Sequence, residues 1–165
     1  MSRDYSRWAL LPLCSVLATS VLAADSSIEL AASSIVATFR QENVPVDAAF
    51  KNFTGTIRYD AAKPAATSAE LTVDMSSLDL GDAATGAEVR TPAWFDSDRF
   101  PQATFRSVKV RPGSAGHFDA IGTLSIKGRA QTVTVSVAVL RTGRAYSFDG
   151  SFELSRRAYG IGDPS

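Results

Sequence analysis

An alternation of apolar and polar residues recurs along most of the chain and constrains its fold more than any other feature. The clearest instance runs from Gln131 to Leu140, with valine at positions 133, 135, 137 and 139 and threonine or serine at positions 132, 134 and 136. A period of two residues is typical of a β-strand with one buried face. The same period predicts six more strands, Ser34–Gln41, Phe50–Tyr59, Ala69–Met75, Ala103–Val110, Phe118–Ile126 and Tyr146–Leu154.

Three segments interrupt this rhythm. The phase of the alternation changes at residues 106–107, which predicts a β-bulge there. Residues 43–47 include Pro45 and are predicted to connect two strands. Residues 78–91 lack the alternation and predict a loop that contains one short helix between Ala83 and Arg90, ended by Pro92.

Short turns join most of the predicted strands, and no helix is long enough for the crossover that parallel strands need, so the sheet is predicted to be antiparallel. Such a sheet either packs as a sandwich or curls into a barrel. Small residues on the apolar face favour the barrel, because they permit sharp coiling and leave interior room. These residues are Ala37, Gly55, Ala120, Gly122 and Gly150. The prediction is an all-β fold, an antiparallel β-barrel with one short helix.

The first 23 residues have the features of a secretory signal peptide. Arg3 and Arg7 form a positively charged start, apolar residues 8–22 follow, and the sequence VLA at 21–23 suits cleavage before Ala24. We therefore expect a signal peptide at 1–23 and one exported domain at 24–165. The only cysteine, Cys14, lies inside the signal peptide, so the exported domain would have no disulfide.

The sequence lacks the residue sets that common enzyme classes use. Its one histidine, His117, stands beside a predicted turn, and its one cysteine lies in the signal peptide. No zinc-ligand set, G-x-S-x-G motif or calcium-loop spacing is present. We predict no catalytic residues, no metal and no catalytic cofactor. The 17 basic residues balance 17 acidic ones, which argues against nucleic acid as a partner and leaves ligand binding as the leading function.

The stretch WFDSDRFPQATF, from Trp94 to Phe105, leads from the predicted helical region into the second half of the sheet. Pro101 pushes Phe100 toward an extended conformation. Trp94 and Phe95 are costly to expose, so we expect them to cover the end of something apolar. Two interpretations stay open: they plug an apolar core, or they line the mouth of a ligand cavity.

The inward face of the predicted barrel supplies the candidate ligand-binding wall. Together with the aromatic pair, the candidate residues are Phe39, Phe53, Ile57, Leu71, Val73, Trp94, Phe95, Phe105, Leu124, Val135, Val137, Phe148 and Phe152. All these side chains are largely apolar, so burial of an apolar ligand would drive binding.

Several short motifs follow one another in order: SIVATF at 34–39, FKNFTG at 50–55, VDMSSLDLG at 73–81, WFD at 94–96, FPQATF at 100–105, GTLSIKG at 122–128 and YGIG at 159–162. Together they resemble the YceI-like family, polyisoprenoid-binding proteins secreted to the bacterial periplasm. The resemblance implies a lipocalin-like antiparallel barrel that holds the isoprenoid tail of a quinone or polyprenyl lipid in its lumen. A small barrel is about wide enough for one slender ligand.

The chain departs from the family pattern in two places. Many members carry a histidine near the end of the first barrel strand, where this chain has Gln41. Relatives continue after the GIG motif with a loop and a further strand, whereas this sequence ends at Ser165. Either the sequence is a truncated piece of the protein or the final closing strand is absent, and a missing closing strand would leave two unpaired sheet edges.

Two functions from different classes remain. The first is a periplasmic carrier of an isoprenoid lipid or quinone. The alternative is an accessory partner of a membrane cytochrome, with a lumen that is merely a packed core. Transient contact with a membrane or a membrane cytochrome, and a homodimer, are the further partners considered. An enzyme is the least favoured reading.

Overall fold

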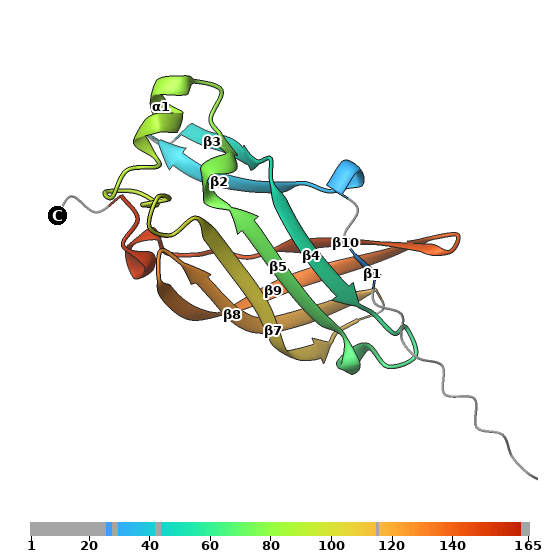
Figure 1. Ribbon diagram of the computed structural model, residues 1–165. Helices are drawn as coiled ribbons and strands as arrows, with labels where there is room; N and C mark the ends of the chain where they lie inside the picture. Colours follow the sequence, from blue (N-terminus) through green and yellow to red (C-terminus); the bar gives the residue numbers. More distant parts are fainter. Residues whose placement is uncertain (1–25, 28–29, 42–43, 115, 163–165) are drawn as a thin grey trace, which may run out of the picture.

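The computed structural model describes residues 26–27, 30–41, 44–114 and 116–162, and Figure 1 shows how they are arranged. The predicted signal peptide at 1–23 lies outside these residues. No helix in the described part of the chain is both long and apolar enough to cross a membrane.

Two antiparallel sheets make up the fold. The larger has seven strands in the order β1 (Ser26–Ser27), β4 (Phe53–Arg58), β5 (Ser68–Asp74), β7 (Gln102–Pro112), β8 (His117–Ile126), β9 (Arg129–Thr142) and β10 (Ala145–Ser151). The smaller has three strands in the order β2 (Ile35–Gln41), β3 (Val44–Phe50) and β6 (Leu78–Asp79). All neighbouring strands pair antiparallel.

The larger sheet curls around its apolar face into a half-barrel (Figure 1). Strand β8 shows why: alternate residues from Phe118 to Ile126 are buried, and those between them are more exposed. The main core contains Met75, Ala103, Phe105, Val110, Phe118, Ala120, Leu124, Ile126, Val137, Tyr159 and Ile161. A second cluster, Ala48, Leu78 and Val89, joins the smaller sheet to the segment after the helix. The predicted all-β, antiparallel barrel class with one short helix is confirmed.

The single α-helix in the described residues, α1 (Ala83–Glu88), lies within the predicted helical segment. It begins after Asp82, whose carboxylate accepts hydrogen bonds from the Thr85 amide at 2.9 Å and the Thr85 hydroxyl at 2.8 Å. Short 3₁₀ helices occupy η1 (Leu30–Ala32), η2 (Pro64–Ala66), η3 (Met75–Ser77) and η4 (Arg156–Tyr159).

The bulge predicted from the sequence is present, and a tight turn follows β8. The register of β7 against β8 shifts between Ser107 and Lys109, and Val108 in the shifted position is 77% exposed. Between β8 and β9, Lys127 and Gly128 form a two-residue turn with φ angles of 49° and 70°. Positive φ at both central residues matches the twist of the flanking strands and favours glycine.

Three boundaries predicted from the sequence are wrong. Phe50 ends β3, and the strand predicted to begin there, β4, begins at Phe53. Residues 44–47 are part of β3 and not a connection, and Pro45 pairs with Arg40 of β2. Strand β6 pairs only with Ala49 and Phe50, so Pro45 lies where β3 is an edge strand, and proline is tolerated there. Strand β10 ends at Ser151 and not at Leu154, because the chain leaves β9 there on its way to η4.

Candidate ligand-binding site

The apolar face of the larger sheet gathers most of the predicted wall residues. Leu71, Phe105 and Leu124 stand side by side across β5, β7 and β8. The predicted residues that belong to the main core or pack against it are Leu71, Trp94, Phe95, Phe105, Leu124, Val135, Val137 and Phe148. Phe53 is buried, and Ile57 and Val73 are half-buried on β4 and β5.

Two predicted wall residues lie elsewhere. Phe39 of β2 packs against the second cluster, with Ala48, Leu78 and Val89. Phe152 follows β10 and is 41% exposed, so its assignment to the inward face of a strand is wrong. The alternation of Tyr146, Phe148 and Gly150 extends to Phe152 in the sequence, but the strand itself does not.

The centre of the apolar face is packed by its own side chains. A Cβ placed on Gly122 would lie 2.6 Å from atoms of the Phe105 ring, so Phe105 fills the space beside this glycine. A Cβ on Gly150 would lie 3.1 Å from Cγ1 of Val135. The expectation that glycines leave interior room is therefore wrong at these positions, since they accommodate a neighbouring side chain instead.

We call the end of the half-barrel that holds Trp94, Tyr159 and Ile161 the closed end. Trp94 packs against both apolar clusters, and the Arg156 guanidinium lies 5.5 Å from the centre of its ring. The backbone N–H of Gly162 donates to the Ala93 carbonyl at 2.9 Å. Tyr159 is 1% exposed and Ile161 4%. These contacts match the core-plug interpretation of Trp94.

Lys127 connects three segments at the closed end. Its Nζ donates to the carbonyls of Pro92 and Gly160, each at 2.7 Å. These two hydrogen bonds join the β8–β9 turn to Pro92, two residues before Trp94, and to Gly160 of the GIG motif. Polar contacts as well as apolar packing therefore close this end.

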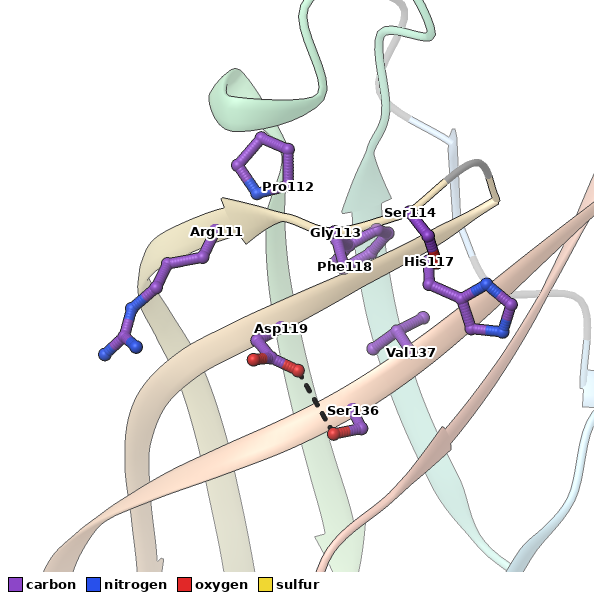
Figure 2. A pocket seen from close by; sticks show the side chains of 9 residues that line it. All are labelled: Arg111, Pro112, Gly113, Ser114, His117, Phe118, Asp119, Ser136 and Val137. Carbon is purple, nitrogen blue, oxygen red and sulfur yellow. Dashed lines mark hydrogen bonds between the residues drawn. The ribbon is translucent and has the colours of Figure 1, made fainter.

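The opposite end carries the turn between β7 and β8, the residues after β4 and the β9–β10 hairpin, and we call it the open end. A hollow of about 410 Å³ lies there, and Figure 2 shows its lining side chains. They are Arg111, Pro112, Gly113, Ser114, His117, Phe118, Asp119, Ser136 and Val137. In this hollow the Ser136 hydroxyl donates to the Asp119 carboxylate at 3.1 Å (Figure 2).

A second hollow of about 250 Å³ shares the turn and reaches the apolar side of the sheet. Its lining residues are Tyr59, Ala61, Pro64, Pro112, Gly113, Ser114, Gly116, His117, Phe118 and Val139. Trp94 and Phe95 line neither of these hollows. Their assignment to a ligand mouth stays a prediction, and the contacts of the closed end do not favour it.

An aromatic group, Tyr59, Phe118, Tyr146 and Phe148, stands at the open end. The ring of Tyr59 lies 5.0 Å from that of Tyr146, 5.4 Å from Phe148 and 6.4 Å from Phe118, measured between ring centres. Of these four residues, the sequence analysis selected only Phe148 as a site residue. The signal it missed was two tyrosines near strand ends, since tyrosine suits a position that is apolar on one side and wet on the other.

Carboxylates with shifted pKa values gather toward the closed end and serve local structure. Hydrogen bonds from the hydroxyl of Ser76 at 2.6 Å and its amide at 2.9 Å lower the pKa of Asp74. The pKa of Asp79 is lowered mainly by the Gly81 amide, and that of Asp82 mainly by the Thr85 amide. These bonds start turns or cap a helix, so they are accounted for without catalysis. The part of the chain that the structure describes holds no group of three or more His, Cys, Asp or Glu side chains placed to bind a metal ion.

The order of motifs and the curled antiparallel sheet agree with a comparison against known families. The sequence model of the YceI-like domain matches residues 24–164. The chain belongs to the YceI-like domain family.

Individual relatives of this YceI-like chain extend the comparison. The UPF0312 protein of Azotobacter vinelandii is 27% identical over 118 residues, which cover 68% of this chain and 62% of the relative. The crystal structure of Burkholderia cenocepacia BcnA is 40% identical, with a TM-score of 0.81 over 83% of this chain and 86% of that one. The chain spans about two thirds of the length of the curated relatives it matches.

A more distant structure shares the fold alone. It is described as a polyisoprenoid binding domain from Saccharophagus degradans implicated in plant cell wall breakdown. Its TM-score is 0.58 at 16% identity, covering 78% of this chain and 75% of that one.

Proposed function

We propose that this protein is a non-enzymatic carrier that holds the isoprenoid tail of a quinone or polyprenyl lipid, and that it works in the periplasm after removal of residues 1–23. The observation that carries the proposal is the aromatic group at the open end. Tyr59 and Phe118 line the smaller hollow, and Tyr146 and Phe148 lie beside them. Apolar surface that stays accessible beside a hollow is typical of a ligand site.

The chemistry of this end suits an amphiphile. Apolar burial contributes roughly 25 cal/mol per Å², so a hydrocarbon tail gains by covering the rings of Tyr59 and Phe148. The tyrosine hydroxyls offer hydrogen bonds to a polar head. Phe118 of this group also lines the larger hollow, whose volume of about 410 Å³ falls in the usual range of about 300–1,000 Å³ for small-molecule sites, whereas the smaller hollow of about 250 Å³ lies below it. The shared fold of the Saccharophagus degradans domain, described as polyisoprenoid binding, supports the choice of ligand class.

One observation favours the alternative function, an accessory partner of a membrane cytochrome with a packed core. Phe105, Leu124 and Val137 are each less than a tenth exposed, and Phe105 fills the space beside Gly122. A ligand that entered deeply would have to move these side chains. In this alternative the protein folds and is exported but carries no lipid.

Lipid extraction distinguishes the two. The protein is purified from the periplasmic fraction, its N-terminus is sequenced, and an organic extract is analysed by mass spectrometry. We expect Ala24 at the N-terminus and an isoprenoid lipid in the extract. A Tyr59→Ala variant should retain several-fold less lipid, because it removes the ring at the centre of the aromatic group.

Thr134→Ala on the exposed side of β9 is the matched control and should retain the wild-type amount. A folded wild-type protein that yields no isoprenoid lipid, and takes up none when quinone is supplied, would contradict the carrier and favour the accessory role. Recovery of unprocessed Met1 from soluble periplasmic material would contradict the export step.

A further inference from the structure

We propose that the β9–β10 hairpin at the open end is a docking surface for an anionic lipid bilayer. The inference rests on the proposed function, since a carrier of a membrane lipid has to meet the membrane at the end where its ligand enters. The part of the protein that would contact the bilayer is the hairpin tip, residues 140–147.

The tip projects beyond the rest of the sheet. Strand β8 pairs with β9 only as far as Ala138, and the amide of Val139 still donates to the Gly116 carbonyl at 2.7 Å. Beyond this point β9 pairs with β10 alone, through Leu140 with Ser147, Arg141 with Tyr146 and Thr142 with Ala145. Three residue pairs at about 3.4 Å each make a ribbon that extends roughly 10 Å. Figure 1 shows this ribbon reaching past the other strands.

The side chains of the tip combine positive charge with apolar surface. Leu140 is 65% exposed and Tyr146 37%. Arg141 Nε donates to the Gly143 carbonyl at 3.0 Å, and its guanidinium lies 5.8 Å from the centre of the Tyr146 ring. Arg144 adds a second cation, and residues 140–148 contain no aspartate or glutamate. Arginine, tyrosine and an exposed leucine together suit the boundary between lipid head groups and acyl chains.

The charge of the open end as a whole points the same way. Residues 58–63, 109–119 and 141–151 carry six basic side chains and three acidic ones, since Asp149 pairs with Ala138 at this end. Residues 24–165 hold 15 basic and 16 acidic residues, so the rest of this segment has nine basic and 13 acidic residues. The positive excess is therefore concentrated where the hollows lie. Anionic lipid head groups attract such an excess, and uncharged ones do not.

Docking and ligand entry are linked through Tyr146. Its ring belongs to the exposed tip and also lies 5.0 Å from Tyr59, which lines the smaller hollow. A lipid tail that leaves the bilayer beside the hairpin would therefore meet aromatic surface along its way to the hollow. Docking by the closed end would instead place Trp94, Arg156 and the GIG motif between bilayer and ligand site.

The test is co-sedimentation with vesicles of phosphatidylcholine alone or of equal parts phosphatidylcholine and phosphatidylglycerol, at low and high salt. Wild-type protein should bind the anionic vesicles, and salt should weaken the binding. The double variant Arg141→Gln/Arg144→Gln should bind on the order of tenfold more weakly. Leu140→Ser should also weaken binding without changing its dependence on salt.

Arg99→Gln/Arg157→Gln removes the same charge far from the hairpin and is the matched control. It should keep wild-type vesicle binding, and thermal melting should show that all variants are folded. Equal loss in both double variants, or equal binding of wild type to both kinds of vesicle, would overturn the docking surface. Extracted lipid is measured on the same samples: vesicle binding without lipid contradicts only the carrier, and lipid without vesicle binding contradicts only the docking surface.

Discussion

The closed and open ends of the half-barrel are built from the same alternating strands, but different segments cover the strand ends. At the closed end, Tyr159 and Ile161 are buried, Arg156 covers Trp94, and Lys127 bonds two carbonyls of different segments. At the open end, Tyr146 is 37% exposed and Tyr59 half-buried, and the chain leaves hollows around the β7–β8 turn. The strands alone therefore do not determine where a ligand enters; the segments that cover them do.

This difference separates residues that stabilise the fold from residues that meet a ligand. A large side chain packed on several sides loses many contacts when truncated, whereas an accessible one loses few. Large aromatics at the two ends should therefore respond oppositely to the same substitution.

The largest effect is expected for Trp94→Ala compared with Tyr146→Ala. Trp94 contacts both apolar clusters, so its truncation should lower the free energy of unfolding by about 3 kcal/mol and leave lipid affinity nearly unchanged. Tyr146→Ala should lower stability by about 1 kcal/mol or less, because its side chain is accessible. It should instead reduce retention of an isoprenoid quinone. Urea unfolding and quinone titration measure the two quantities.

A reversed result would exchange the roles of the two ends. If Trp94→Ala remained stable but lost quinone, Trp94 would line the mouth, as one reading of the sequence proposes. If both variants lost only stability, neither aromatic would touch the ligand. That result would support the alternative function, an accessory partner with a packed core.

Most of the fold is readable from the sequence because strand alternation is a local signal. The alternation at residues 131–140 predicts β9, and the phase change at 106–107 predicts the bulge. The exceptions depend on contacts that the alternation does not show. Residues 44–47 become a strand because β2 folds back on them as a hairpin, with Gln41 opposite Val44, although Pro45 favours a connection there. Strand β10 ends where the following residues turn toward the closed end.

The candidate site is less readable for the same reason. The alternation identifies which side chains face inward, but not which end of the strands remains uncovered. Trp94 is the most conspicuous aromatic in the sequence, and Arg156 and Gly162, more than 60 residues later, cover it. Tyr59 and Tyr146 are far apart in the chain and become neighbours only when the sheet curls.

A smaller effect is expected for Tyr159→Phe at the closed end. The Tyr159 hydroxyl is buried and has no hydrogen-bond partner among the described residues. A buried unpaired hydroxyl is unfavourable, so its removal should raise the free energy of unfolding by about 1 kcal/mol. Burial also raises the pKa of Tyr159 above its ordinary value of 10.0.

The raised pKa predicts an alkaline signature. The folded state favours the neutral phenol of Tyr159. The contribution of this preference to the free energy of unfolding is fully present below pH 10.0 and is lost as pH rises through the folded pKa. Tyr159→Phe should lack this loss, which urea unfolding at about pH 7 and about pH 11 measures. A less stable variant at neutral pH would mean that the hydroxyl is bonded after all.

The smallest effect is expected for Asp74→Asn, which tests how carboxylates hold the closed end. The Ser76 hydroxyl and amide lower the pKa of Asp74, so its stabilisation is fully present above pH 3.8 and is lost as pH falls through the folded pKa. Asp74 is partly exposed to solvent, and screening keeps the contribution below about 1 kcal/mol. Trp94 fluorescence during acid titration reports on this end. Asp74→Asn should flatten part of the acid transition, and Ser76→Ala, which removes only the hydroxyl donor at 2.6 Å, should flatten less of it. If Ser76→Ala flattened as much as Asp74→Asn, the hydroxyl alone would account for the shift, and the amide that begins η3 would contribute nothing.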